Sequence, residues 1–122
     1  DPADDRPVYT AQDIAGLLTD NAGFRLLVPQ PEQQLGKKLR TADLQILAGL
    51  YDALGMPADV IYLLVCHCVE RARSQWGEGR RPTMRQVEKE GYRWAQLGIF
   101  DQNSAAVYLK KWAERNRKYT SY

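Results

Sequence analysis

The consecutive residues Cys66, His67 and Cys68 are of types that could perform chemistry. A thiol beside an imidazole can act as a nucleophile, and Cys and His are also common zinc ligands. Both activities require the groups to converge in space. Neighbouring side chains on a helix diverge by about 100°, and the sequence holds no second Cys/His cluster. We therefore expect packing roles, with His67 satisfied by a local hydrogen bond, and neither a metal site nor a disulfide here.

Two other patterns resemble reactive sites only superficially. Glu88 and Glu90 are close in sequence, but they face different directions on a helix, where Arg85 and Lys89 are near enough to pair with them. The segment 77–81 (GEGRR) has the glycines of a phosphate loop, but it lacks the Lys-Ser/Thr ending and a preceding strand. The sequence therefore predicts no catalytic residue, no cofactor and no enzymatic activity.

The C-terminal stretch 110–122 combines cations with aromatic rings around a single acidic residue, Glu114. Cations can neutralise phosphates, and aromatic faces can stack on unpaired bases. The expected DNA-binding residues are Lys110, Lys111, Arg115, Arg117, Lys118, Tyr119 and Tyr122. Five arginines around the preceding loop could extend this patch: Arg71, Arg73, Arg80, Arg81 and Arg85. The alternative is an ordinary solvated helix end whose cations complement the helix dipole.

Charge is unevenly distributed, which agrees with a polyanionic partner for the second half of the chain. Residues 1–60 hold 5 Lys/Arg and 9 Asp/Glu, whereas residues 61–122 hold 12 Lys/Arg and 6 Asp/Glu. The 122 residues and 44% hydrophobic content suit one domain with a single core. No apolar run approaches the ~20 residues of a membrane span, and the start has no signal-peptide pattern. Two cysteines without a disulfide framework indicate a reducing compartment, so we expect a cytoplasmic protein.

Capping residues and apolar spacing predict an all-α fold, a compact orthogonal bundle of about six helices. Thr10 should cap the first helix and Thr41 the third, and Thr83 with Gln86 forms a capping box. Asp101 or Asn103 should cap the last helix. The expected helices are 11–19, 31–36 with Pro31 at its start, 42–54, 57–75, 84–97 and 104–116. The sequence is compatible with either a helix or an extended strand at 24–28.

The segment 57–75 is expected to be the central, most buried helix, because VIYLLVCHCV is apolar on all sides. Helix 84–97 should pack on it through Trp94, and Tyr108, Leu109 and Trp112 should anchor the last helix. Residues 1–8 are expected to be a linker or the boundary of an excised piece. Residues 9–116 then form the helical domain, and residues 117–122 form a basic, aromatic tail.

The segments YTAQDI, LGKKLRTADLQIL, LYDALGMPADVIYLLVCHC and PTMRQVEKEGYRWAQLGIF occur in this order, and a helix with AAVYL follows them. This order resembles the DnaD-like domain of bacterial and phage replication-initiation proteins over roughly 9–110. The most recognisable feature is Trp94-x3-Gly98-Ile99. Many family members carry Tyr-x3-Ile-x3-Trp on this helix, and here Gln86 and Glu90 stand at the Tyr and Ile places.

The resemblance implies a role in primosome assembly. Family members bind single- and double-stranded DNA, self-associate, and help to load the replicative helicase. For this chain we expect DNA binding with weak sequence preference. In them, DNA binding lies largely in the last helix of this domain and the segment after it, which corresponds to 110–122 here. The expected partners are therefore DNA, replication-initiator or helicase-loading proteins and a second copy of the chain, with no membrane. The alternative is a scaffold that contacts a helicase or initiator without binding DNA, through the acidic N-terminal half and the Trp76 loop.

Overall fold

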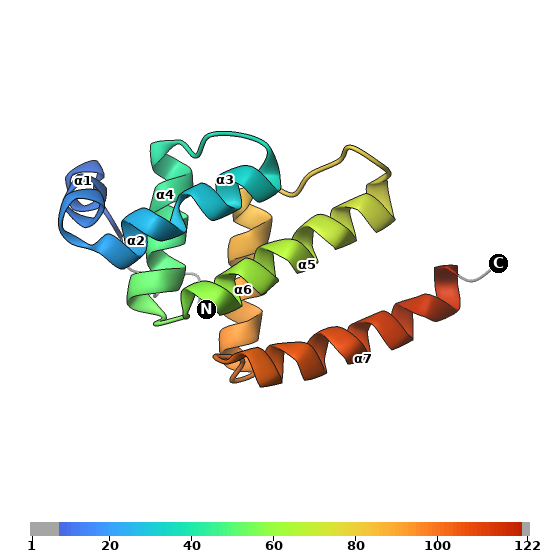
Figure 1. Cartoon of the computed structure of the whole chain (residues 1–122). Coiled ribbons are helices and arrows are strands. Elements are labelled where there is room, and N and C mark those ends of the chain that lie inside the picture. The colour runs from blue at the N-terminus through green and yellow to red at the C-terminus, as the bar shows by residue number, and fades with distance from the viewer. Residues whose placement is uncertain (1–7, 121–122) are drawn as a thin grey trace.

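The computed structural model describes the backbone of residues 8–120 and the side chains of residues 8–116. All regular secondary structure within this range is helical (Figure 1). The elements are α1 (Ala11–Asp20), α2 (Ala22–Leu27), α3 (Pro29–Leu35), α4 (Thr41–Ala48), the π-helix η2 (Gly49–Ala53), α5 (Ala58–Trp76), α6 (Met84–Gln96) and α7 (Gln102–Thr120). The prediction of an all-α fold is confirmed. The predicted linker, apart from Val8, lies outside the described residues.

Three helix starts follow from local capping that the sequence predicts. Thr10 forms a capping box at α1, and Thr83 forms one with Gln86 at α6. At α7, Asp101 rather than Asn103 is the cap, because its carboxylate accepts the backbone N–H of Ser104 at 2.7 Å. Each cap satisfies first-turn N–H groups that have no partner within the helix.

Residues 24–27 belong to α2, and Val28 is a turn residue with helical backbone angles between α2 and α3, so the helical alternative for 24–28 is the correct one. Asn21 ends α1 and also caps α2, since its side chain accepts the backbone N–H of Phe24 at 2.9 Å. The start predicted for the next helix was wrong, because α3 begins at Pro29 and not at Pro31. Proline is tolerated there because first-turn N–H groups lack helical acceptors.

The predicted helix 42–54 was wrong in two details. Thr41 is the first helical residue and Arg40 is the cap; the N–H of Arg40 donates to the Asp43 carboxylate at 3.1 Å. In addition, the α-helix gives way after Ala48 to the π-helical turn η2. Gly49, a poor α-helix former, stands at this transition.

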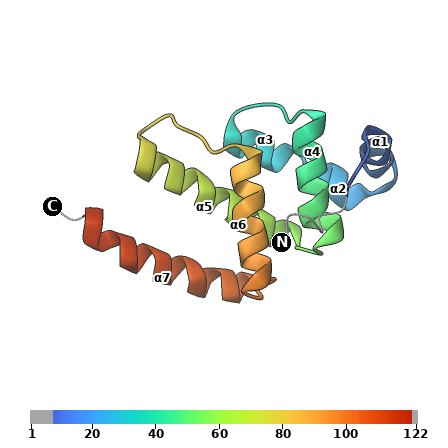
Figure 2. The same cartoon turned by 180° about the vertical axis from the view of Figure 1, so that it is seen from behind.

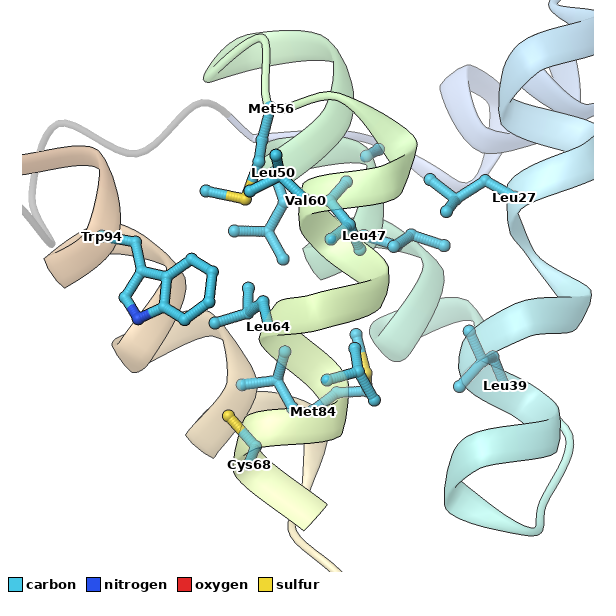
Figure 3. Close-up of a cluster of buried hydrophobic side chains, with 14 of the residues drawn as sticks. Leu27, Leu39, Leu47, Leu50, Met56, Val60, Leu64, Cys68, Met84 and Trp94 are labelled. Carbon is cyan, nitrogen blue, oxygen red and sulfur yellow. The ribbon is translucent and has the colours of Figure 1, made fainter. Parts of the chain in front are cut away.

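Helix α5 is the central helix, as predicted, and it packs against α3, η2, α6 and α7. The surrounding core includes Leu47, Leu50, Met56 and Leu64 (Figure 3). The prediction that Trp94 joins α6 to this core is confirmed, because the indole is fully buried. The apolar first half of α5 is not buried on every side, since Tyr62 is 46% exposed.

Helix α7 lies on the opposite side of α5 from α3 (Figures 1 and 2). Its inward residues are the predicted ones: Ala105 is buried, and Tyr108, Leu109 and Trp112 are half-buried. Because α7 is 19 residues long, its later turns extend well beyond Ala105. No helix in the described range is long and apolar enough to cross a bilayer.

Candidate nucleic-acid interface

A cleft of about 450 Å³ opens between α5, α6 and α7, and we refer to it as the C-terminal cleft. Each of the three helices contributes a cation and two of them contribute an indole ring. The cations and indole rings that line the cleft are Arg71, Trp76, Lys89, Arg93, Trp112 and Arg115. The cleft therefore combines positive charge with aromatic surface, the two features that the sequence indicated for the C-terminal stretch.

Three of the cations in the cleft are available to an external anion. Lys89, Arg93 and Arg115 are exposed, and no carboxylate among residues 8–116 forms an ion pair with any of them. Arg71 differs, because its Nη1 lies 3.1 Å from Oε1 of Glu90 at the base of the cleft. Since Glu90 is the one acidic residue among those lining the cleft, the cleft carries net positive charge.

The aromatic rings of the cleft are held at two depths. Trp76 is the last residue of α5 and is 47% exposed, so a large part of its indole is open to solvent. Trp112 is half-buried and meets the His67 ring edge-on, with ring centroids 4.9 Å apart. A partly exposed indole can stack on a nucleobase whatever the base, because every base has a π face.

Glu90 connects the three helices at the base of the cleft. Its Oε2 accepts hydrogen bonds from Trp94 Nε1 at 3.0 Å and from the Tyr108 hydroxyl at 2.9 Å, and its Oε1 accepts one from Arg71 at 3.1 Å. His67 Nε2 lies 3.5 Å from Oε2, at the long limit of a hydrogen bond. One carboxylate thus binds side chains of α5, of its own helix α6 and of α7.

This environment stabilises the charged form of Glu90. Burial alone would raise the pKa of the carboxyl group, but the hydrogen bonds and the Arg71 charge outweigh it and lower the pKa from 4.5 to about 2. Burial, and next the hydrogen bond to Glu90, raise the pKa of the Tyr108 hydroxyl. At neutral pH, Glu90 is therefore an anion fixed by its neighbours, with its acceptor sites directed at structural donors.

The Cys-His-Cys segment behaves largely as packing, as predicted. Cys66 and Cys68 form no disulfide, and burial, followed by the charge of Glu90, raises the pKa of the Cys68 thiol to about 12. A thiol that stays protonated is a poor nucleophile. His67 makes no local hydrogen bond through Nε2, because that nitrogen faces Glu90 on another helix. Within residues 8–116, no three His, Cys, Asp or Glu side chains could share a metal ion.

The two carboxylates of α6 have different partners. Glu88 lies 3.7 Å from Arg85, as the sequence indicated. The pairing expected for Glu90 was wrong, because its cationic partner is Arg71, 19 residues earlier in the chain. Sequence spacing favours partners three or four residues away, whereas tertiary packing brings Arg71 to this buried carboxylate.

The DNA-binding residues expected from the sequence do not share one face of α7. Lys111 and Arg115 lie beside Tyr108 on the side of the cleft, where they border a shallow hollow. Lys110 is exposed two positions before Trp112, and it therefore projects from the opposite face of the helix. Arg117, Lys118 and Tyr119 belong to the last turns of α7, but their side chains lie outside the described residues, as does Tyr122.

The structure adds two cations that sequence reasoning missed, Lys89 and Arg93, which line the cleft from α6. Their spacing of four residues on one helix face was the available signal. Of the arginines expected to extend the patch, Arg71 lies in the cleft. Arg73 instead pairs with Glu70 and Glu78, and Arg80 and Arg81 are exposed in the α5–α6 loop.

No protein-family model, curated protein or solved structure matches this chain. The fold and the site together define the class of protein: a helical domain with a basic, aromatic cleft.

Proposed function

We propose that this chain is a DNA-binding and assembly module of a cytoplasmic replication-initiation machinery, and that it has no catalytic step. The observation that carries the DNA-binding part is the C-terminal cleft, in which three cations without carboxylate partners among residues 8–116 surround two partly exposed indoles. Lys89, Arg93 and Arg115 contact phosphates in this account. Trp76 and Trp112 contact bases.

The chemistry of the cleft favours weak sequence selectivity. Cations read phosphates, which carry no sequence information, and indole faces accept any base. Binding should therefore depend steeply on salt, because each neutralised phosphate releases condensed counterions. Both single-stranded DNA and duplex DNA present the required phosphates, and unpaired bases add the stacking contribution.

The replication role rests on the resemblance of the sequence segments to DnaD-like domains. Two features of the fold are compatible with it. The segment that carries Trp94-x3-Gly98-Ile99 forms α6 and its end, where Trp94 and Ile99 are buried. Gly98 adopts a left-handed backbone with φ of 76°, which favours glycine at this position. The expected protein partners are helicase-loading or initiator proteins, together with further copies of the chain.

The DNA-binding part is tested by titrating labelled single-stranded and duplex oligonucleotides with the protein at low and moderate salt, followed by anisotropy. The triple variant Lys89→Ala, Arg93→Ala, Arg115→Ala should bind at least tenfold more weakly, with a flatter salt dependence. The charge-retaining variant Lys89→Arg, Arg93→Lys, Arg115→Lys is the matched control and should keep most of the affinity.

Unchanged affinity in the alanine triple variant would refute the assignment of DNA binding to this cleft. An equal effect of Lys110→Ala alone would also count against it, because Lys110 projects from the opposite face of α7. Circular dichroism of each variant should show an intact fold, since all three substituted side chains are exposed.

Exposed apolar side chains around the α6–α7 turn favour a second candidate, a protein-interaction scaffold. Leu97, Phe100 and Val107 are 56%, 38% and 54% exposed. Exposed apolar side chains that form one surface patch can mark a contact with a protein partner. The triple variant Leu97→Ser, Phe100→Ser, Val107→Ser should then lose concentration-dependent assembly in sedimentation experiments and keep DNA affinity. Assembly that survives the substitutions would eliminate this surface as the contact.

A further inference from the structure

A second basic cleft, of about 1140 Å³, lies on the other side of α6, and we refer to it as the N-terminal cleft. The connection between α3 and α4 contributes three cations to it, and the first turn of α6 contributes a fourth. These residues are Lys37, Lys38, Arg40 and Arg85. The cations that line this cleft therefore come from both halves of the chain, although residues 1–60 have a net negative charge.

The connection that carries the three cations is held in place by one acidic residue. The carbonyl of Glu32 accepts the N–H of Lys37 at 3.1 Å, and its carboxylate accepts the N–H of Leu39 at 2.9 Å. Leu39 is buried, whereas Lys37 and Lys38 on its N-terminal side and Arg40 on its C-terminal side are exposed. The backbone that carries these cations is thus already ordered, so binding need not order it again.

The charges of the N-terminal cleft are only weakly compensated within residues 8–116. Lys37 and Arg40 form no ion pair there, and Lys38 and Arg85 approach carboxylates no closer than 3.7 Å. The side chains of Lys38 and Arg85 are 93% and 74% exposed, so these contacts contribute little. The carboxylate of Asp43 is directed at the backbone N–H of Arg40.

Helix α6 is the shared wall of the two clefts. Arg85 and Glu88 face the N-terminal cleft, whereas Lys89 and Arg93 face the C-terminal cleft. Seen from behind, α6 stands in front, with α4 on one side and α7 on the other, and α5 passes behind it (Figure 2). A helix is about 10–12 Å across, which corresponds to roughly three nucleotides at about 3.4 Å per nucleotide.

We propose that a single DNA strand occupies both clefts and crosses the N-terminal half of α6, with its phosphates on Lys37, Lys38 and Arg40 at one end. This inference rests on the proposed function of the C-terminal cleft. The exposed Arg80 and Arg81 lie in the loop immediately before α6 and can neutralise phosphates near the crossing. The N-terminal cleft is then a second subsite for the sugar-phosphate backbone, and it acts only on strands long enough to reach it.

The test compares single-stranded oligonucleotides of about 3 nucleotides, the length that the crossing of α6 alone requires, and of about 20 nucleotides, above the usual span of a single-strand site. The triple variant Lys37→Ala, Lys38→Ala, Arg40→Ala should bind the long strand about tenfold more weakly. Its salt slope on that strand should fall by about 2, because each neutralised phosphate of a single strand adds about 0.7 to the slope. Binding of the short strand should not change. The charge-retaining variant Lys37→Arg, Lys38→Arg, Arg40→Lys should behave like the unsubstituted protein.

The outcomes separate this inference from the proposed function. Normal binding of the long strand by the alanine variant would overturn the second subsite and leave the C-terminal cleft as the DNA site. Equal weakening on both lengths would overturn the crossing, because the N-terminal cleft would then bind short strands by itself. If the unsubstituted protein bound neither strand, the proposed function would fail and this inference would fall with it.

Discussion

The hydroxyl of Tyr108 on α7 donates a 2.9 Å hydrogen bond to Oε2 of Glu90 on α6. The other carboxylate oxygen of Glu90 accepts from Arg71, which lines the C-terminal cleft from α5. The relative positions of the three walls of the cleft therefore depend on one buried carboxylate. Substitutions at Glu90 and its partners should therefore change the stability of the fold, whereas substitutions of exposed residues lining the cleft should not.

Removing the Tyr108 hydroxyl should loosen α7 without unfolding the domain. We expect Tyr108→Phe to lose about 1.5–3 kcal/mol of unfolding free energy, the usual contribution of a hydrogen bond to a charged group. Hydrogen exchange should accelerate mainly in α7. Tyr62→Phe is the matched control, because Tyr62 is exposed on α5 and removal of its hydroxyl should leave stability unchanged. Equal effects of the two substitutions would contradict a structural role for the Tyr108–Glu90 bond.

The lowered pKa of Glu90 predicts a stability loss at acid pH. A carboxyl group with a lower pKa in the folded state binds fewer protons there than in the unfolded chain. Its contribution is complete above pH 4.5 and disappears as the pH falls through about 2. The shift corresponds to about 3 kcal/mol. Urea unfolding of Glu90→Gln should show a lower free energy of unfolding at neutral pH and a shallower decline of that free energy across this pH window. Glu114→Gln is the control and should behave like the unsubstituted protein. Parallel pH profiles for Glu90→Gln and the unsubstituted protein would refute this prediction.

Trp94 should be the tryptophan on which the fold depends most. Its ring is fully buried between α6 and the core, so we expect Trp94→Ala to cost roughly 3–5 kcal/mol. Thermal unfolding measures the effect, with Trp76→Ala as the control, because Trp76 is 47% exposed. An unchanged melting temperature for Trp94→Ala would remove this residue from the core.

Trp76 should contribute to DNA affinity and not to the stability of the fold. We expect Trp76→Ala to weaken single-stranded DNA binding by about 1–3 kcal/mol, the usual contribution of one base stacked on an aromatic ring, with little change in melting temperature. Trp76→Phe keeps an aromatic face and should recover most of the affinity. Equal affinity of all three proteins for an oligonucleotide would exclude stacking on Trp76.

The parts of the fold that the sequence could predict depend on neighbouring residues. The capping boxes at Thr10 and Thr83 join groups three positions apart, and the burial of Trp94 follows from helical spacing. The π-turn after Ala48 was not predicted, because the apolar stripe of 42–54 continues through it. The start of α3 at Pro29 was missed because proline is acceptable at either candidate position.

The cleft could be predicted only in part, since it is formed by tertiary contacts. Arg115 was found because it stands in a cationic stretch. Lys89 stands between two glutamates and Arg93 between two aromatic residues, and they line a shared cleft only because α6 packs beside α5 and α7. The partners of Glu90, Arg71 and Tyr108, are 19 and 18 positions away in the sequence. No local pattern in the sequence connects residues at such separations.

Photo-cross-linking tests the central claim, DNA binding in the C-terminal cleft, most directly. A single-stranded oligonucleotide with 5-bromouracil at each position in turn is irradiated with the full chain, and the cross-linked residues are identified by mass spectrometry. If DNA binds in the C-terminal cleft, cross-links should form at Trp76 and Trp112 and none at Trp94, which is buried. Cross-links confined to α1–α3, or their absence from both cleft tryptophans at saturating DNA, would contradict it.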